Sequence, residues 1–307
     1  MLTSHVSFAR ILCPTDFSEF SDAALTYAAA LADTYGGAVR LLHVVTPFPV
    51  IAPYSNLPGE TRLYETARAA GEEALAGLAA RVRTPGLTVD VEQRSGAVVH
   101  EILQVAGDWQ ADVIVMGTHG RGGFERLVLG SVAEKVLRKA PCAVLAVPKP
   151  AVAAARLGTV RLGHLLCPVD GSAASVQGVA AAASLTERCD ARLTLVSVVE
   201  SIPYGGDFVG PEFAAFREAR ERHARAVLDE ALPSEVRVRC RVRDRLVYGH
   251  PAQQILEVAA QEQPDLIVMG IQGRGAVDLA MFGSTTNHVV RHADQPVLTV
   301  RPPAATA

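Results

Sequence analysis

The sequence carries one pattern of glycines twice, and this internal repeat constrains the fold more than any other feature. The stretches "VMGTHGRGGFERLVLGS" (115–131) and "VMGIQGRGAVDLAMFGS" (268–284) share the spacing Gly, two residues, Gly, nine residues, Gly-Ser. Other segments repeat at nearly the same offset: "RILCPTDFS" (10–18), for example, matches "HLLCPVDGS" (164–172). A chain of 307 residues with such a repeat is expected to contain two domains of one fold.

We place domain 1 at residues 1–150 and domain 2 at 160–307. The segment between them, "PKPAVAAARLGTV" (148–160), has two prolines, a glycine and no strand-like alternation, which is typical of a linker. Each half alternates short runs rich in Val, Ile and Leu with longer amphipathic segments. Such runs indicate strands covered on both faces, and their alternation with helices predicts an α/β fold with a parallel sheet.

The expected elements follow this alternation. In the first half, strands are predicted at 8–13, 38–45, 87–92, 112–117 and 142–147, and helices at 18–35, 60–83, 98–109 and 131–138. In the second half, strands are predicted at 162–167, 192–199, 236–242, 265–270 and 296–301.

Ligands of open parallel sheets bind beyond the carboxyl ends of strands, where the strand order reverses. Two segments of each half follow strands at such a place: 14–16 and 117–120 in the first, 168–170 and 270–273 in the second. A glycine turn followed by a helix start at Gly130-Ser131 offers backbone N–H groups to phosphate, and the Asp16 carboxylate can accept hydrogen bonds from a ribose or a base. The pattern therefore predicts a nucleotide site. The alternative is that the glycines only pack, and the repeat does not discriminate, because duplication copies scaffold and site alike.

Rival motifs fit less well. "GTHGRGG" lacks the Lys and Ser/Thr of a Walker A loop, and "GRGGFE" follows the fourth predicted strand rather than the first, unlike a dinucleotide fingerprint. The sequence contains no GxSxG and no HExxH. His5, His43, His100, His164 and His250 show no ligand spacing, so no metal site is assigned.

Composition excludes some classes of function. A formal net charge of -3 argues against a large nucleic-acid surface, and the absence of a run of eighteen apolar residues argues against a membrane span. The opening "MLTSHVSFAR" has no basic segment followed by an apolar one, so no secretory signal is expected. Five cysteines without a CxxC suggest buried, reduced thiols in a cytoplasmic protein, with a metal or redox site as the alternative.

Several separated motifs together resemble the universal stress protein family. They are "LCPTDFS", "LLHVV", "ADVIVMGTHGRGG" and "LGSVAEKVLRKAPCAVLAV", in the family's order and spacing. The resemblance covers nearly the whole chain, as two tandem domains. It implies an open, Rossmann-like sheet of five parallel strands in each domain, with helices on both faces.

The resemblance further implies ATP binding, because the family branch that binds ATP carries this glycine pattern. The aspartate after the first strand then contacts adenosine, the residue after "LLH" reads the adenine edge through its backbone, and the glycine segments cradle the phosphates. In the first half the implied residues are Pro14, Thr15, Asp16, Val44, Met116, Gly117, Gly120, Arg121, Gly130, Ser131 and Val132. In the second half they are Asp170, Val198, Met269, Gly270, Gly273, Gly283, Ser284 and Thr285. Mg²⁺ can accompany ATP, but no protein ligand for it is identified.

The two halves differ around the glycines. Thr118-His119 of the first half becomes Ile271-Gln272, and Arg126 becomes Leu279. A phosphate contact by His119 or Arg126 would make the first site the tighter one; a solvated side chain at either position is the other possibility. Family members dimerise through their last strands, which implies an intramolecular pseudo-dimer of 142–147 with 296–301, and allows a further homodimer.

Three functions remain open on the sequence. The first is an ATP-binding regulatory protein of the stress response. The second is a slow ATPase or phosphotransferase, for which the sequence shows no P-loop lysine and no base beyond Asp16 and His119. The third is an assembly module whose sites no longer bind nucleotide.

Overall fold

The computed structural model describes residues 7–46, 60–83, 86–120, 129–154, 160–200, 211–271 and 283–301. These residues form two compact units, one ending at Val160 and the other beginning at Arg161. The first unit contains β1 (Arg10–Pro14), α1 (Glu19–Tyr35), β2 (Ala38–Val45), α2 (Glu60–Val82), β3 (Thr88–Ser95), α3 (Val98–Asp108), β4 (Val113–Gly117), α4 (Ser131–Lys139), β5 (Ala143–Val147) and α5 (Lys149–Ala154).

The second unit repeats this order with one extra short helix. It contains β6 (His164–Pro168), α6 (Ala173–Cys189), β7 (Arg192–Glu200), α7 (Pro211–Glu230), α8 (Ser234–Arg239), β8 (Val242–Gly249), α9 (Pro251–Glu262), β9 (Leu266–Gly270), α10 (Ser284–His292) and β10 (Val297–Val300).

Each unit has a parallel sheet of five strands, which confirms the predicted fold class. The strand order is β3-β2-β1-β4-β5 in the first unit and β8-β7-β6-β9-β10 in the second. The order therefore reverses between β1 and β4, and again between β6 and β9. This reversal marks the place where a parallel sheet of this kind binds ligands.

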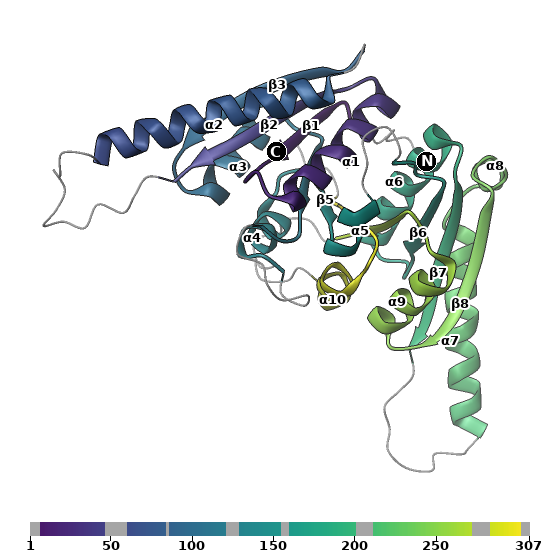
Figure 1. Ribbon diagram of the computed structural model, residues 1–307. Coiled ribbons are helices and arrows are strands. Elements are labelled where there is room, and N and C mark those ends of the chain that lie inside the picture. The colour runs from purple at the N-terminus through teal and green to yellow at the C-terminus, as the bar shows by residue number, and fades with distance from the viewer. Residues whose placement is uncertain are drawn as a thin grey trace, which may run out of the picture. The chain divides into compact units, whose positions relative to one another are not determined.

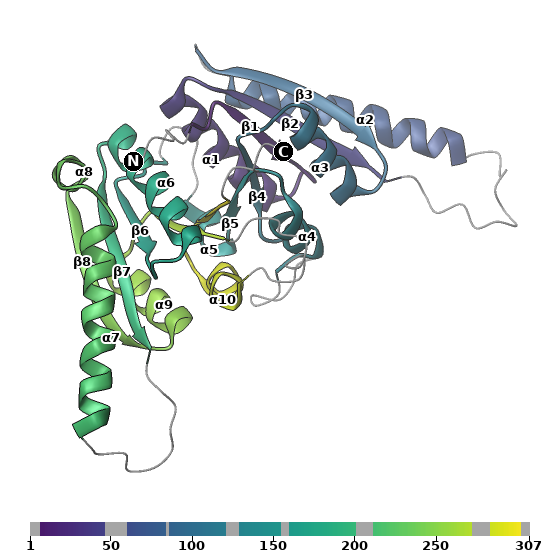
Figure 2. The ribbon, with the colours of Figure 1, turned by 180° about the vertical axis from the view of Figure 1, so that it is seen from behind.

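Helices cover both faces of the sheet in the first unit. Its connections through α1 and α2 advance along the sheet in one direction, and those through α3 and α4 advance in the other. Right-handed crossovers place the two pairs on opposite faces, and α1 lies in front of the strands in Figure 1, whereas α3 does so in the reverse view of Figure 2. The strands between these layers are buried, with Ile11, Leu12 and Cys13 fully inaccessible.

The helices that follow β1 and β6 begin in the same way. Ser18 caps α1 by accepting a hydrogen bond from the N–H of Ser21, and Ser172 caps α6 through the N–H of Ser175. These caps fix the first turn of each helix beside the end of the preceding strand. The loops that carry Asp16 and Asp170 are thereby held in place.

The strand expected at 236–242 is wrong. Residues Ser234–Arg239 form α8, and the strand begins at Val242. The alternation of Val and Arg in this segment is typical of a strand, but a strand forms only where a neighbouring strand is available for hydrogen bonding. β8 pairs with β7 from Val242 opposite Leu193 onward, and β7 itself begins at Arg192. The residues before β8 therefore have no strand to pair with.

Part of the segment predicted as a linker is helical. After Pro148 the chain forms α5, in which Ala151 is buried and the Lys149 ammonium lies 5.9 Å from the centre of the Phe20 ring. Residues 155–159 lie outside the described part of the chain.

The cysteines are free thiols, and three of them are buried: Cys13, Cys167 and Cys240. Burial raises the pKa of Cys13 to about 12 and that of Cys240 to about 11, so both thiols stay protonated near neutral pH. No helix among the described residues is long and apolar enough to cross a membrane.

Candidate functional site

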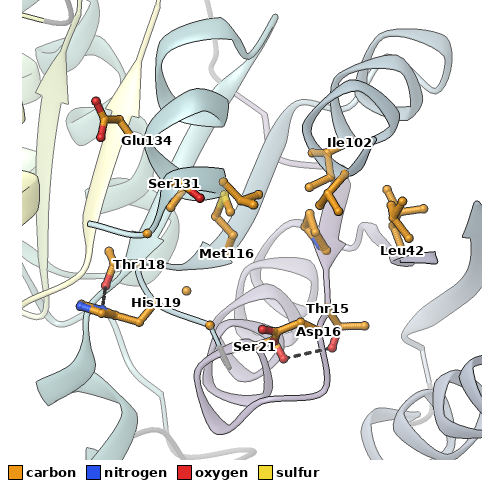
Figure 3. Close-up of a pocket in the computed structure, with 18 of the residues that line it drawn as sticks. Thr15, Asp16, Ser21, Leu42, Ile102, Met116, Thr118, His119, Ser131 and Glu134 are labelled. Atoms are coloured by element: carbon orange, nitrogen blue, oxygen red, sulfur yellow. Dashed lines mark hydrogen bonds between the residues drawn. The ribbon is translucent and has the colours of Figure 1, made fainter. Parts of the chain in front are cut away.

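A cavity of about 920 Å³ opens at the carboxyl ends of β1 and β4, at the reversal of strand order in the first unit. Figure 3 shows the side chains around it. The residues predicted for the first site meet here, apart from Arg121, which lies outside the described residues. Those that line the cavity are Pro14, Thr15, Asp16, Val44, Met116, Gly117, Gly120, Gly130, Ser131 and Val132.

The loop after β1 holds Asp16 at one wall. Its Oδ1 accepts hydrogen bonds from the N–H and the hydroxyl of Ser18, at 3.1 and 2.6 Å. Its Oδ2 faces Gly120, where a Cβ atom would lie only 2.6 Å away. A glycine at this position therefore lets the turn after β4 approach the carboxylate closely.

The carboxyl end of β2 presents backbone groups to the cavity. The Leu42 carbonyl accepts a hydrogen bond from the Thr15 N–H at 2.8 Å, on the β1 side. The Val45 carbonyl accepts one from the Gly96 N–H at 3.1 Å, on the β3 side. Because peptide groups alternate sides along a strand, Val44 directs its N–H and C=O to the β1 side, where β1 has already ended. A donor beside an acceptor matches the hydrogen-bonding edge of adenine.

The helix α4 begins at the cavity without a side-chain cap among the described residues. The N–H of Gly130, which precedes it, donates to the Thr118 carbonyl at 2.8 Å and is therefore engaged. The next N–H groups, of Ser131, Val132 and Ala133, have no acceptor within the helix, and these residues line the cavity. Together with the helix dipole they form a site for an anion.

The first glycine of each motif has a packing role. A Cβ on Gly117 would lie 2.9 Å from the Phe20 Cβ, so α1 approaches the end of β4 because residue 117 has no side chain. The constraint is tighter at Gly270, where a Cβ would overlap the Ala174 carbonyl oxygen of α6. Gly283, in contrast, has nothing within 4 Å of such an atom among the described residues. The first glycine of the motif therefore allows close helix packing, whereas the last glycine is available for the approach of a ligand.

His119 lies at the rim of the cavity. Its Nδ1 is 2.9 Å from the Thr118 hydroxyl, and its ring centre is 5.7 Å from that of Phe20. Figure 3 shows the imidazole directed toward Thr118. A phosphate contact by His119 would require the ring to turn. Arg126, the other side chain predicted to distinguish the two sites, lies outside the described residues.

The described lining contains two carboxylates, Asp16 and Glu134, and no lysine or arginine. Figure 3 shows the two carboxylates on opposite walls, so they do not form one metal site. Among the described residues no group of three or more His, Cys, Asp or Glu can hold a metal ion. Each carboxylate alone is a hard oxygen ligand, which suits Mg²⁺ that arrives on phosphate oxygens.

Sequence reasoning missed most of the apolar wall of the cavity. Leu42, Val98, Ile102 and Leu129 line it, but such residues carry no signal that separates a cavity wall from the core. His43 has no metal-ligand spacing in the sequence and carries no other signal of a site. In the structure its Nδ1 lies 2.9 Å from the Thr15 carbonyl oxygen, and it lines the cavity next to Val44.

The second unit places its predicted residues at the equivalent strand and helix ends. Asp170 follows β6, Val198 lies in β7, and Met269 and Gly270 end β9. The residues at the start of α10 are Gly283, Ser284 and Thr285. Gly273 lies outside the described residues.

The aspartate of the second unit is held as in the first. Burial alone would raise the pKa of Asp170, but hydrogen bonds from Ser172 and Ser175 outweigh it and lower that pKa. Asp170 is therefore ionised at neutral pH. The next residue is Gly171, with φ of 79°, where the first unit has Phe17 with φ of 60°. A left-handed backbone costs a phenylalanine more than a glycine, so the first unit stores strain beside its cavity.

Comparison with known proteins gives one consistent family. A model of the universal stress protein family matches residues 7–148 and 162–301. A universal stress protein of Mycolicibacterium smegmatis is 33% identical over 300 residues, which cover 95% of this chain and 97% of that protein. One from Methanocaldococcus jannaschii is 36% identical over 146 residues, or 47% of this chain and 84% of its own. The solved structure of one from Archaeoglobus fulgidus has the same fold, with a TM-score of 0.69 at 22% identity, covering 96% of this chain and 98% of its own.

Proposed function

This chain belongs to the universal stress protein family, and we propose that it is an ATP-binding regulatory protein. The observation that carries the proposal is the meeting of three features in one cavity of the first unit. They are the backbone N–H and C=O of Val44 beyond the end of β1, the carboxylate of Asp16, and the start of α4, which has no side-chain cap among the described residues.

These features suit the three parts of ATP in order. Adenine fits against the Val44 N–H and C=O, with Val98 and Ile102 as apolar wall. Asp16 accepts hydrogen bonds from the ribose hydroxyls. The phosphates lie on the N–H groups that open α4, where the helix dipole favours negative charge. Mg²⁺, when bound, would neutralise phosphate charge, and Glu134 is the lining carboxylate that would be left to hold it while Asp16 binds the ribose.

A regulatory role is favoured over phosphoryl transfer. Transfer requires charge neutralisation and a positioned nucleophile, and the described lining supplies no lysine or arginine. We therefore expect at most slow hydrolysis, with ATP acting through occupancy of the site. The free, buried thiols suit a reducing compartment such as the cytoplasm.

We also propose that the two units pair through their fifth strands. Within each unit this strand lies at an edge of the sheet, β5 beside β4 and β10 beside β9. Both strands are apolar, with the sequences AVLAV and VLTV. An exposed apolar edge invites association, and pairing the two edges removes that liability.

Base selectivity tests the proposed site. Guanine presents an acceptor and a donor in the opposite order to adenine at the edge that Val44 would read, so GTP is expected to bind about tenfold or more weakly than ATP. Competition between the two nucleotides for the full chain, followed by fluorescence of a labelled ATP analogue, measures the ratio. Equal affinity would show that Val44 does not read the base, and a fast release of phosphate would favour an ATPase instead.

A further inference from the structure

The helix α10 carries two histidines one helical turn apart. His288 and His292 stand at positions i and i+4, which share one face of a helix. Their rings stack, with centroids 4.1 Å apart and planes 22° from parallel. His292 is exposed and His288 is half-buried, so solvent reaches the pair. Neither residue belongs to the predicted nucleotide site, which on this helix comprises Ser284 and Thr285.

The ring of His292 is oriented by its own helix. Its Nδ1 lies 2.8 Å from the carbonyl oxygen of His288, and a carbonyl only accepts hydrogen bonds, so Nδ1 carries the proton. A neutral ring then has its lone pair on Nε2, which points away from that carbonyl. Proteins orient imidazole ligands of metals in this way, by donating the other ring N–H to a backbone carbonyl.

We propose that His288 and His292 form a binding site for a divalent transition metal of the class that imidazole prefers: Zn²⁺, Ni²⁺ or Cu²⁺. Nε2 of His292 and one ring nitrogen of His288 are the protein ligands. Water or a donor from solution completes the coordination, because the described residues contain no group of three or more metal-ligating side chains that can hold an ion.

Two cationic or titratable groups lie near the pair. The Nε of Arg291 donates to the Asn287 Oδ1 at 2.5 Å, and His250 is close enough to His288 to act on its charge. The rings lie next to each other but stacked, and because each lone pair lies in its ring plane, the rings must turn for both nitrogens to reach one ion.

The first unit lacks this pair and supplies a natural control. The corresponding helix α4 has the same length and carries Lys135 and Lys139 at the equivalent positions. A protonated ammonium group has no lone pair to offer a metal. The double variant His288→Lys/His292→Lys therefore gives α10 the residues that α4 already accommodates.

The test uses the full chain without a polyhistidine tag, titrated with Zn²⁺ and, separately, with Cu²⁺. Calorimetry is expected to show one metal per chain. The second imidazole binds intramolecularly, which strengthens binding by on the order of 100-fold, so His292→Ala should weaken binding by at least tenfold, and the double lysine variant should lose the site. His223→Ala, which removes an exposed histidine of α7, should bind as the wild type does.

A readout specific to the ligands separates coordination from a structural effect. Electron paramagnetic resonance of the Cu²⁺ form should show two nitrogen donors in the wild type and fewer in the variants. Far-ultraviolet circular dichroism without metal verifies that the variants fold. Lys135→His and Lys139→His can then be added to the double lysine variant. This moves the histidine pair to α4 and should restore one metal site there. No binding by the wild type, or unchanged binding in the double lysine variant, would overturn the proposal.

Discussion

At the scale of single residues, a substitution at Ser131 tests the proposed phosphate site most specifically. It is the first residue of α4, and Gly130 before it has φ of −57° and ψ of 140°, a conformation that a following proline accepts. Ser131→Pro thus removes one N–H from the cavity without breaking a hydrogen bond of the helix. Losing a donor to a charged group costs about 1.5–3 kcal/mol, so ATP affinity should fall roughly ten- to hundredfold.

The matched control is Ser131→Ala, which removes only the hydroxyl and keeps the backbone donor. It should lose less affinity than the proline variant, and both should keep the thermal midpoint of the wild type. Calorimetric titration with ATP measures the difference. Wild-type affinity in the proline variant would mean that the start of α4 does not hold the phosphates.

His164 is a buried titratable residue of the second unit, far in sequence from its glycine motif. Its Nδ1 accepts from Arg192 at 3.1 Å, and its Nε2 lies 2.9 Å from the Thr194 hydroxyl. Burial lowers the pKa of His164, and the charge of Arg192 lowers it further, against the opposing effects of Glu262 and Asp265.

This environment predicts a loss of stability in mild acid. The folded-state pKa of His164 lies below its unfolded value of 6.5. The unfolded chain therefore takes up the proton first, and stability that is present above pH 6.5 declines as the pH falls through the folded pKa. The thermal midpoint should drop between about pH 7.5 and about pH 5.5, and His164→Asn should reduce that drop. An identical pH dependence in the variant would contradict this role.

At the scale of elements, the packing around the glycine motif predicts that alanine destabilises the fold at the first glycine and not at the last. Gly270→Ala forces α6 away from β9, because the new Cβ overlaps the Ala174 carbonyl, and should destabilise the chain by about 3 kcal/mol. Gly283→Ala, with open space around the Cβ, should change stability by less than about 1 kcal/mol. Urea unfolding of the two variants provides the comparison. A similar loss in both would show that close packing does not explain the first glycine.

The sequence predicts the elements that are set by a local pattern of residues, and it misses those that are set by contacts with other elements. Buried strands are continuous apolar runs, and β2 is predicted with its observed bounds, Ala38–Val45. The edge strand β8 is not, because its start is set by where β7 begins, at Arg192, which no local pattern records. The helix α5 is missed for a similar reason: its packing against α1 is a tertiary effect.

The same contrast applies to the site. Strand ends predict that Asp16, Gly117 and Gly130 meet, because a parallel sheet brings its carboxyl ends together. Which glycine serves packing and which serves ligand binding is not predictable, since it depends on the distance between Gly117 and Phe20. The role of Gly130 also differs from expectation: its N–H is engaged by Thr118, and the donors shift to the following residues.

At the scale of the whole molecule, hydrogen exchange tests the proposed pairing of the fifth strands. The Val147 carbonyl faces β4, since it accepts from the Thr118 N–H, so the N–H groups of Val144 and Ala146 point away from β4. Pairing of β5 with β10 predicts slow exchange of these two amides in the full chain, at rates close to those of the sheet interior. Exchange at the rate of an exposed edge would contradict the pairing.

The two sites are expected to differ in affinity, because His119 and Arg126 of the first half are replaced by Gln272 and Leu279 in the second. Ser131→Pro weakens the first site and leaves the second unchanged, and Ser284→Pro does the reverse. We expect the first site to hold ATP about tenfold more tightly, the effect of about 1.4 kcal/mol. Titration of each variant ranks the sites, and a tighter second site would refute the ranking.

The central claim is that the cavity at the reversal of strand order binds ATP. Calorimetric titration of the full chain with ATP and Mg²⁺ tests it most directly, with Ser131→Pro/Ser284→Pro as the paired variant. The account predicts saturable binding by the wild type, with the tighter phase lost on Ser131→Pro and both phases weakened in the double variant. Absence of binding by the folded wild type, or binding that the double variant leaves intact, would contradict it.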